Sequence, residues 1–144
     1  MMKWVLATLG VLALLVAGVV IVGYALPQSH IASRSTRLSK PPEEVWQLLT
    51  DVASYPSWRT EVDSVEQLSS HGDTMMWREV TRNDNLTFEA VTSDAPFHFV
   101  ARISDKGLPF GGSWDYRITP DGDGSRLTIT ENGEVYNPVF RFVS

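Results

Sequence analysis

Two glutamates, Glu79 and Glu131, are the residues of this sequence that best fit acid–base chemistry. Each follows an alternating apolar run, so strand periodicity would turn its carboxylate toward the apolar face of a sheet. Burial beside apolar walls would raise the pKa of such a carboxylate and suit it to act as a general base. From the same face, Tyr116 could donate a hydrogen bond to a ligand carbonyl.

A simpler interpretation stays open for all three side chains. Each glutamate lies near the end of its strand, where a bulge can reverse the face, and it could be solvated or paired with Arg78, Arg102 or Arg117. A tyrosine in a core usually has a satisfied hydroxyl group. We therefore treat the three residues as weak catalytic candidates and leave the catalytic set, and enzymatic activity itself, undecided.

The spacing of apolar residues predicts which helices and strands position these candidates, and this spacing changes along the chain. A strand over 31–38 is followed by a helix that begins within 39–44, where a serine, two prolines and two acids are typical of a helix start. Residues 51–58 predict a second short helix or turn. Gly111 and Gly112 read as a bend between strands. Period-two alternation and turn residues predict six further strands, over 62–68, 74–82, 86–92, 97–104, 113–119 and 126–135.

The apolar positions of these strands fall on one face. A long antiparallel meander must curl and bury one side, so this face should be concave and lined by aromatic rings, as small-molecule pockets are. In particular, Trp77, Phe97, Phe99, Trp114 and Tyr116 are predicted to share it. We interpret Asp51, Tyr55, Trp46 and Trp58 as packing or turn residues. The candidate ligand-binding residues are Met75, Trp77, Phe88, Phe97, Phe99, Phe110, Trp114, Tyr116, Ile118 and Ile129.

Composition argues against several other classes of site. The 144 residues carry a formal net charge of -5 and no basic stripe, which argues against a nucleic-acid partner. The chain has no cysteine, and its histidines, His30, His71 and His98, are scattered, so we expect no metal. No glycine loop precedes a helix in the manner of a phosphate site, and we expect no cofactor.

Residues 4–26 form an apolar run without a charged side chain, long enough as a helix to cross a bilayer. We predict one continuous helix that stands clear of the rest, with a membrane anchor over 1–27 and a single domain over 28–144. A cleaved secretory signal is the alternative, although its apolar part would be shorter. Lys3 on one side, and Arg34, Arg37 and Lys40 on the other, leave the side of the membrane undetermined.

Three local signatures carry a resemblance to a known superfamily. They are Lys40-Pro41-Pro42-Glu43-Glu44-Val45-Trp46, the run from Asp51 through Tyr55-Pro56-Ser57-Trp58, and Leu108-Pro109-Phe110-Gly111-Gly112-Ser113-Trp114. In this order the chain resembles the SRPBCC superfamily, which includes polyketide cyclase/dehydrase-like, START and birch-pollen-allergen-like proteins. The resemblance implies an α+β helix-grip fold: a curved antiparallel sheet of about seven strands, with two short helices after the first strand.

The resemblance also implies a long C-terminal helix across the sheet, and here only its beginning is expected, over 136–142. We expect a truncated helix, or another structure over the groove. The leading functional hypothesis is a membrane-tethered module for a small hydrophobic ligand, such as a lipid or a polyketide-like compound. The alternatives are a cyclase or dehydratase in the same groove, with Glu79 or Glu131 as the base, and a ligand-free interaction domain.

Overall fold

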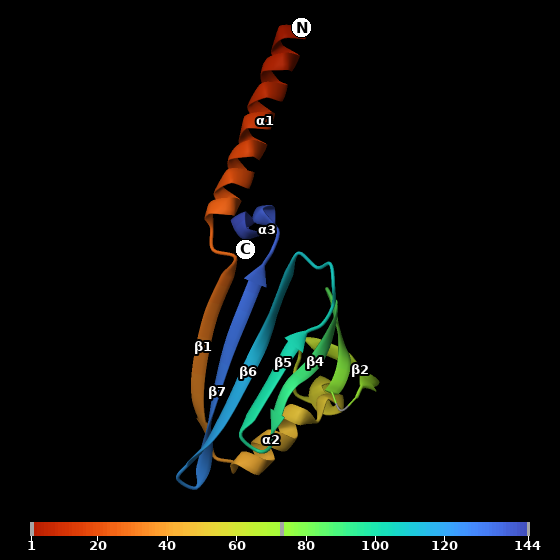
Figure 1. The fold of residues 1–144 in the computed structure, drawn as a ribbon, viewed down its shortest axis with the longest axis vertical. Helices are drawn as coiled ribbons and strands as arrows, with labels where there is room; N and C mark the ends of the chain where they lie inside the picture. Colours follow the sequence, from red (N-terminus) through yellow and green to blue (C-terminus); the bar gives the residue numbers. More distant parts are fainter. Residues whose placement is uncertain (1, 73, 144) are drawn as a thin grey trace.

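The computed structural model describes residues 2–72 and 74–143. Met1, Asp73 and Ser144, which belong to the predicted anchor and domain, lie outside the described residues. A long N-terminal helix leads into a sheet and two short helical segments, and a third short helix follows the last strand (Figure 1). The elements are α1 (Met2–Ala25), β1 (Ser29–Leu38), α2 (Pro42–Thr50), the 3₁₀ helix η1 (Val52–Ser57), β2 (Val62–His71), β3 (Thr74–Thr81), β4 (Asn85–Asp94), β5 (His98–Ile103), β6 (Phe110–Asp121), β7 (Gly124–Val135) and α3 (Pro138–Val143).

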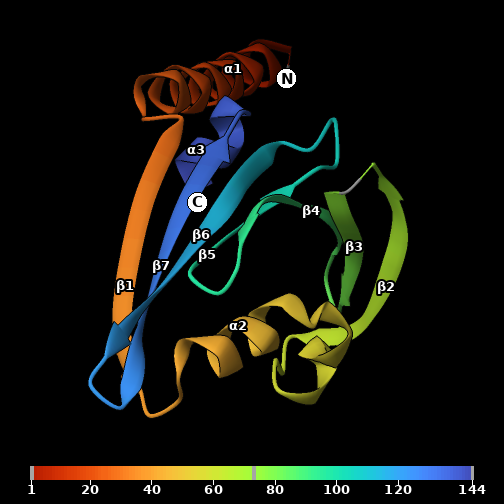
Figure 2. The same ribbon diagram turned by 60° about the horizontal axis from the view of Figure 1, so that its bottom comes forward.

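The seven strands form one antiparallel sheet in the order β1-β7-β6-β5-β4-β3-β2. Strands β2 to β7 follow each other as a meander, and β1 joins the far edge beside β7. The sheet curves, and α2 and η1 lie on its inner side (Figure 2). This arrangement confirms the predicted α+β helix-grip fold.

The register places the predicted aromatic positions opposite each other on the inner face. Between β5 and β6, Phe99 pairs with Tyr116 and Ala101 with Trp114; between β3 and β4, Trp77 pairs with Phe88. Rings of Trp77 and Phe88 stack with centroids 5.6 Å apart. Trp46 of α2 sets its ring edge-on against Phe99, 6.1 Å between centroids, so it packs the helix onto the sheet as predicted.

Helix α2 begins within the predicted range 39–44. The residue before its first turn is Pro41, which makes no side-chain capping bond. Pro42 stands in the first turn, where its missing N–H costs nothing, and two acidic residues follow near the positive end of the helix dipole. The helix buries Val45 and Leu49 against the sheet.

Two strand boundaries also correct the prediction. Phe97 lies outside β5 in a turn closed by its own N–H donating to Asp94 O at 2.9 Å, and its side chain is 48% exposed, so it does not share the buried face. Gly111 and Gly112 lie inside β6 rather than at a bend before it. A side chain at Gly112 would place its Cβ 2.6 Å from Asn132 O of β7, which explains the glycine there.

Helix α1 contains one stretch, Ala7–Ala25, that is long and apolar enough to cross a membrane by length and composition, with a mean hydropathy of 2.4. It projects from the sheet over most of its length (Figure 1). Its last turn, however, packs against α3: Gly23 leaves no room for a side chain beside Pro138, and Arg141 donates to Gly23 O and Leu26 O, each at 3.3 Å. The prediction of a helix wholly clear of the domain is wrong at this end.

Helix α3 is short, as predicted, and begins with Asn137 Oδ1 accepting a hydrogen bond from Val139 N at 2.8 Å. It lies beside the end of α1 and not across the inner face of the sheet (Figure 2). Among the described residues no helix covers the inner face of β1, whose side chains are exposed almost throughout.

Candidate functional site

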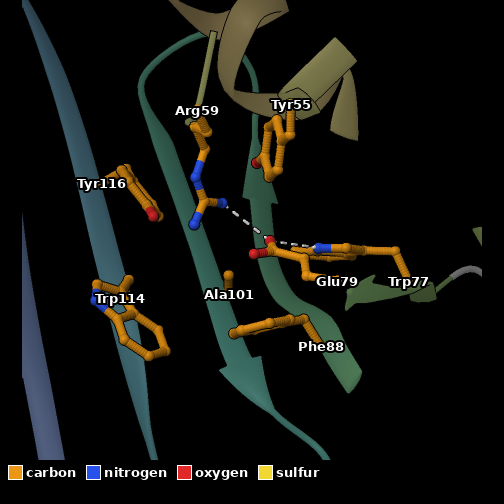
Figure 3. A pocket seen from close by; sticks show the side chains of 8 residues that line it. All are labelled: Tyr55, Arg59, Trp77, Glu79, Phe88, Ala101, Trp114 and Tyr116. Carbon is orange, nitrogen blue, oxygen red and sulfur yellow. Dashed lines mark hydrogen bonds and ion pairs between the residues drawn. The ribbon is translucent and has the colours of Figure 1, made fainter. Parts of the chain in front are cut away.

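The space between the inner face of the sheet and the two helical segments holds a cavity of about 790 Å³, called here the main cavity. A smaller cavity of about 140 Å³, the inner cavity, lies deeper against the sheet. Both are lined by Tyr55, Arg59, Trp114 and Tyr116, so they adjoin. The other walls of the main cavity are mostly aliphatic, from Leu38, Val45, Leu48, Leu49, Leu127 and Ile129. The inner cavity adds Trp77, Glu79, Phe88 and Ala101 (Figure 3).

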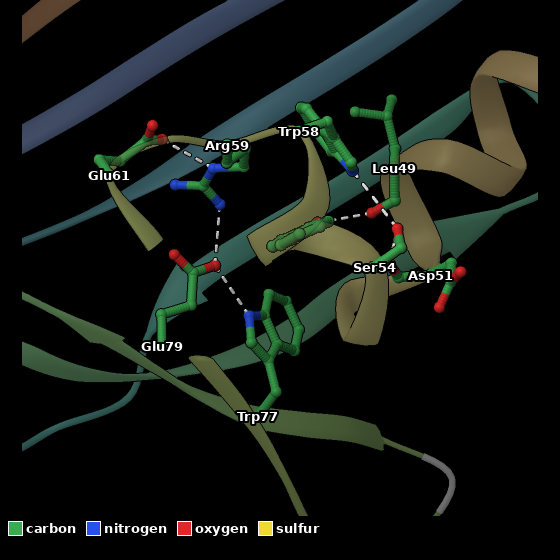
Figure 4. Close-up of polar contacts among 9 residues, drawn as sticks. Leu49, Asp51, Ser54, Trp58, Arg59, Glu61, Trp77 and Glu79 are labelled. Carbon is green, nitrogen blue, oxygen red and sulfur yellow. Dashed lines mark hydrogen bonds and ion pairs between the residues drawn. The ribbon is translucent and has the colours of Figure 1, made fainter. Parts of the chain in front are cut away.

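Arg59 is the central polar residue of both cavities. It follows η1, and its Nη1 donates to Glu79 Oε1 at 3.0 Å while its Nε donates to Glu61 Oε1 at 2.8 Å (Figure 4). The guanidinium carbon lies 4.9 Å from the centroid of the Tyr55 ring, within the range of a cation–π contact. Burial lowers the pKa of Arg59, but the bonds and charges of the two glutamates outweigh it and raise the pKa overall.

Glu79 is a buried carboxylate, with only 5% of the residue exposed. Besides Arg59, it accepts a hydrogen bond from Trp77 Nε1 at 3.0 Å, and both bonds end on Oε1. A buried charge is tolerated only when it is paired and hydrogen-bonded, which explains why Arg59 and the indole converge on it. Glu61, the exposed partner of Arg59, accepts a hydrogen bond from it, and this bond lowers the pKa of the Glu61 carboxylate.

The two tyrosines of the cavities stay neutral near pH 7. Burial is the main cause that raises the pKa of Tyr116 to about 12, and it also raises that of Tyr55. Tyr55 donates its hydroxyl proton to Leu49 O at 2.6 Å, which ties η1 to the end of α2. Tyr116 makes no side-chain hydrogen bond to any described residue, and its hydroxyl lies near the Arg59 guanidinium (Figure 3).

The family model for polyketide cyclase / dehydrase and lipid transport matches residues 29–144, which is most of the chain. The chain belongs to this family. The match begins at the first residue of β1, and α1 precedes it. No curated protein has a matching sequence.

Solved structures of the same fold support the assignment of the architecture. The Zhui aromatase/cyclase from Streptomyces sp. R1128 is 18% identical, with a TM-score of 0.65 over 74% of this chain and 68% of that one. A START superfamily protein from Mycobacterium smegmatis is 17% identical, with a TM-score of 0.60 over 74% and 77%. Truncated norcoclaurine synthase from Thalictrum flavum is 9% identical, with a TM-score of 0.64 over 81% of each chain. At these identities the likeness shows the fold alone.

In this family member, the predicted ligand-binding residues separate into three groups. Trp77, Phe88, Trp114, Tyr116 and Ile129 line the cavities. The fully buried Phe99 and Ile118, and the partly buried Met75, pack in the core. The turn residue Phe97 and Phe110 line neither cavity; Phe110 borders a separate hollow with Tyr136 at the other end of β6.

The two glutamates proposed from the sequence do not meet. Glu79 lies on β3 and Glu131 on β7, and β4, β5 and β6 separate them in the sheet. The Glu131 side chain is 44% exposed and lies 3.7 Å from His30 Nε2 on β1, outside both cavities. Neither glutamate pairs with Arg78, Arg102 or Arg117. Among the described residues, no group of histidines and acids is placed to hold a metal ion.

The sequence interpretation missed Arg59 and Glu61, and it gave Tyr55 and Trp58 only structural roles. Tyr55 lines both cavities, and Trp58 lies edge-on to its ring, 5.3 Å between centroids, at the wall of the main cavity. One signal was available. A glutamate expected among buried aromatic residues needs a cationic partner, and Arg59 directly follows the aromatic Tyr55–Trp58 segment.

Proposed function

We propose that this protein binds a small hydrophobic molecule in the main and inner cavities. The observation that carries the proposal is the main cavity itself: about 790 Å³ between sheet and helices, lined chiefly by aliphatic and aromatic side chains. Ligand sites are usually cavities of about 300–1,000 Å³ with apolar walls and a few convergent polar groups. Membership of a family described by polyketide cyclization, dehydration and lipid transport agrees with this chemistry.

We further propose that α1 is a single-pass anchor that holds the domain over 28–144 at a membrane. The helix has no polar face and is almost wholly exposed along Ala7–Ala25, which favours a lipid environment. Carbonate extraction of membranes from cells that produce the full chain tests this part. Intact protein should stay in the membrane pellet; its full release, without cleavage, would contradict the anchor.

Mass spectrometry of molecules that co-purify with the full chain tests ligand binding. Ile129→Trp should fill the main cavity from β7 and lower the amount of bound molecule severalfold. Ile31→Trp is the matched control, because Ile31 is 75% exposed on β1 and lines neither cavity. Equal recovery from both variants would contradict binding in this cavity.

A cyclase or dehydratase in the same cavity is the second candidate. It is favoured by one observation: Glu79, Arg59 and Tyr116 line the inner cavity together, where a substrate carbonyl could meet donors and a carboxylate. A co-purified molecule that is converted by the wild type, but recovered unchanged with Glu79→Gln, would support an enzyme. A ligand-free interaction domain is not favoured, because side chains leave cavities of about 790 and 140 Å³ between the sheet and the helices.

A further inference from the structure

The polar atoms that face the inner cavity are both donors and acceptors. Arg59 has five N–H groups, and its two hydrogen bonds to carboxylates start from Nε and Nη1, so Nη2 donates to no described residue. Glu79 accepts both of its hydrogen bonds on Oε1, so Oε2 accepts none from the described residues. The hydroxyl of Tyr116, on the same wall, is also without a partner there.

These free atoms are open to the cavity and not sealed in protein. Among the described residues, the buried side-chain polar atoms that lack a hydrogen-bond partner are Asp115 Oδ1 and Arg141 Nε, both outside the cavities. Arg59 Nη2, Glu79 Oε2 and the Tyr116 hydroxyl are not among them, and all three residues line the inner cavity (Figure 3). A ligand there can therefore accept from one residue and donate to another.

The charges around the two cavities decide which polar group fits. Lys40 and Arg59 contribute two positive charges, and Glu44, Glu61 and Glu79 contribute three negative ones, so the lining carries one net negative charge. Each cation is already paired: Lys40 lies 2.7 Å from Glu44, and Arg59 contacts both remaining glutamates. An entering carboxylate would meet an excess of like charge in partly dry surroundings.

We propose that the inner cavity selects an uncharged ligand that carries a hydrogen-bond donor beside a carbonyl, such as an amide or a hydroxyketone, on an apolar body. The ligand carbonyl accepts from Arg59 Nη2 and Tyr116, and its N–H or O–H donates to Glu79 Oε2. Carboxylates of the same shape bind more weakly. This inference rests on the proposed hydrophobic-ligand function and names the ligand class of the same site.

Three probes on one skeleton test the inference by calorimetry, with the full chain in lipid nanodiscs and empty nanodiscs as the blank. Naphthalene-2-carboxamide offers both donor and acceptor, 2-naphthoate is its anionic counterpart, and 2-methylnaphthalene has no polar group. We expect the amide to bind about tenfold or more tighter than the naphthoate, and severalfold tighter than 2-methylnaphthalene.

A matched pair of surface variants tests whether the negative charge around the cavities weakens naphthoate binding. Neither variant replaces a buried group. Glu61 and Glu66 are both surface carboxylates, each with 61% of its side chain exposed and each paired with an arginine, but only Glu61 lines a cavity. Glu61→Gln should raise the ratio of naphthoate affinity to amide affinity severalfold, because it removes one negative charge from the cavity lining. Glu66→Gln should leave this ratio unchanged.

The outcomes separate this inference from the proposed function. Naphthoate that binds the wild type as tightly as the amide, or equal effects of Glu61→Gln and Glu66→Gln, would overturn the inferred selectivity. Equal binding of 2-methylnaphthalene and the amide would overturn it too, while leaving a hydrophobic ligand site in place. If none of the three probes binds, the proposed function fails and the inference fails with it.

Discussion

Arg59 Nη1 and Glu79 Oε1 lie 3.0 Å apart, with 27% of the arginine side chain and 6% of the glutamate side chain exposed. The pair joins the segment after η1 to β3, so it fastens the helical layer to the inner face of the sheet. It also places two charged groups in the wall of the inner cavity, whose other lining residues are uncharged. The same two residues therefore join the two layers of the fold and carry the proposed ligand recognition.

Removing one member of this pair should destabilise the fold. Arg59→Met leaves the buried Glu79 carboxylate unpaired, and we expect the free energy of unfolding to fall by about 3 kcal/mol or more. Arg78→Met is the control, because Arg78 pairs with Glu66 at the surface at 3.2 Å and should matter by about 0.5 kcal/mol or less. Denaturant titration of the full chain measures both; equal effects would contradict a structural role for the buried pair.

Adding Glu79→Met to Arg59→Met should recover part of the lost stability, since the double variant buries no unpaired charge. The same titration gives the coupling energy of the pair. If the stability lost in the double variant equals the sum of the losses in Arg59→Met and Glu79→Met, the two side chains do not interact in solution.

Stability should fall in alkali because of Tyr116. Its pKa is about 12 in the folded protein and about 10 in the unfolded chain. Between these values the unfolded chain has released the proton and the folded protein still holds it, so rising pH favours unfolding. The contribution of Tyr116 is complete below pH 10 and is lost at about 1.4 kcal/mol per pH unit as pH rises toward 12.

Tyr116→Phe should flatten this part of the stability curve, measured by denaturant titration between pH 9 and pH 12. Ultraviolet titration of the phenolates supplies a second readout, because the variant should lose a late-titrating group. Loss of an early-titrating group, near pH 10, would contradict the burial of this hydroxyl.

Phe99 and Phe97 offer a direct test of the strand boundary at β5. Phe99 is fully buried and contacts the rings of Trp46, Trp77 and Tyr116, so Phe99→Ala should cost about 3–5 kcal/mol of stability. Phe97→Ala removes a half-exposed turn side chain and should cost less than about 1 kcal/mol. Comparable losses on thermal or chemical denaturation would place Phe97 in the core after all.

The contact between α1 and α3 should be sensitive to a single methyl group. At Gly23 an added Cβ would collide with the Pro138 carbonyl, whereas at Gly18 it meets nothing within 4 Å. Gly23→Ala should therefore displace α3 and speed tryptic cleavage after Arg141, and Gly18→Ala should not. Cleavage at the same rate in both variants would show that the two helices are not held together.

The sequence by itself determined the order of the elements and which strand residues point to the same face of the sheet. Alternation is a local property of the backbone, since successive side chains point to opposite faces, and it assigned Trp77, Phe99, Trp114 and Tyr116 to one face correctly. It failed at Phe97, where a turn ends the alternation one residue before the strand begins.

Only the tertiary structure decided which polar groups meet. Periodicity put Glu79 and Glu131 on the same face, but it does not measure the distance across a sheet, and β4, β5 and β6 keep them apart. Arg59 reaches Glu79 across 20 positions of the sequence, because η1 ends above the curved sheet where β3 passes. A buried charge requires a partner wherever the fold can supply one, and which partner that is depends on packing that no local pattern encodes.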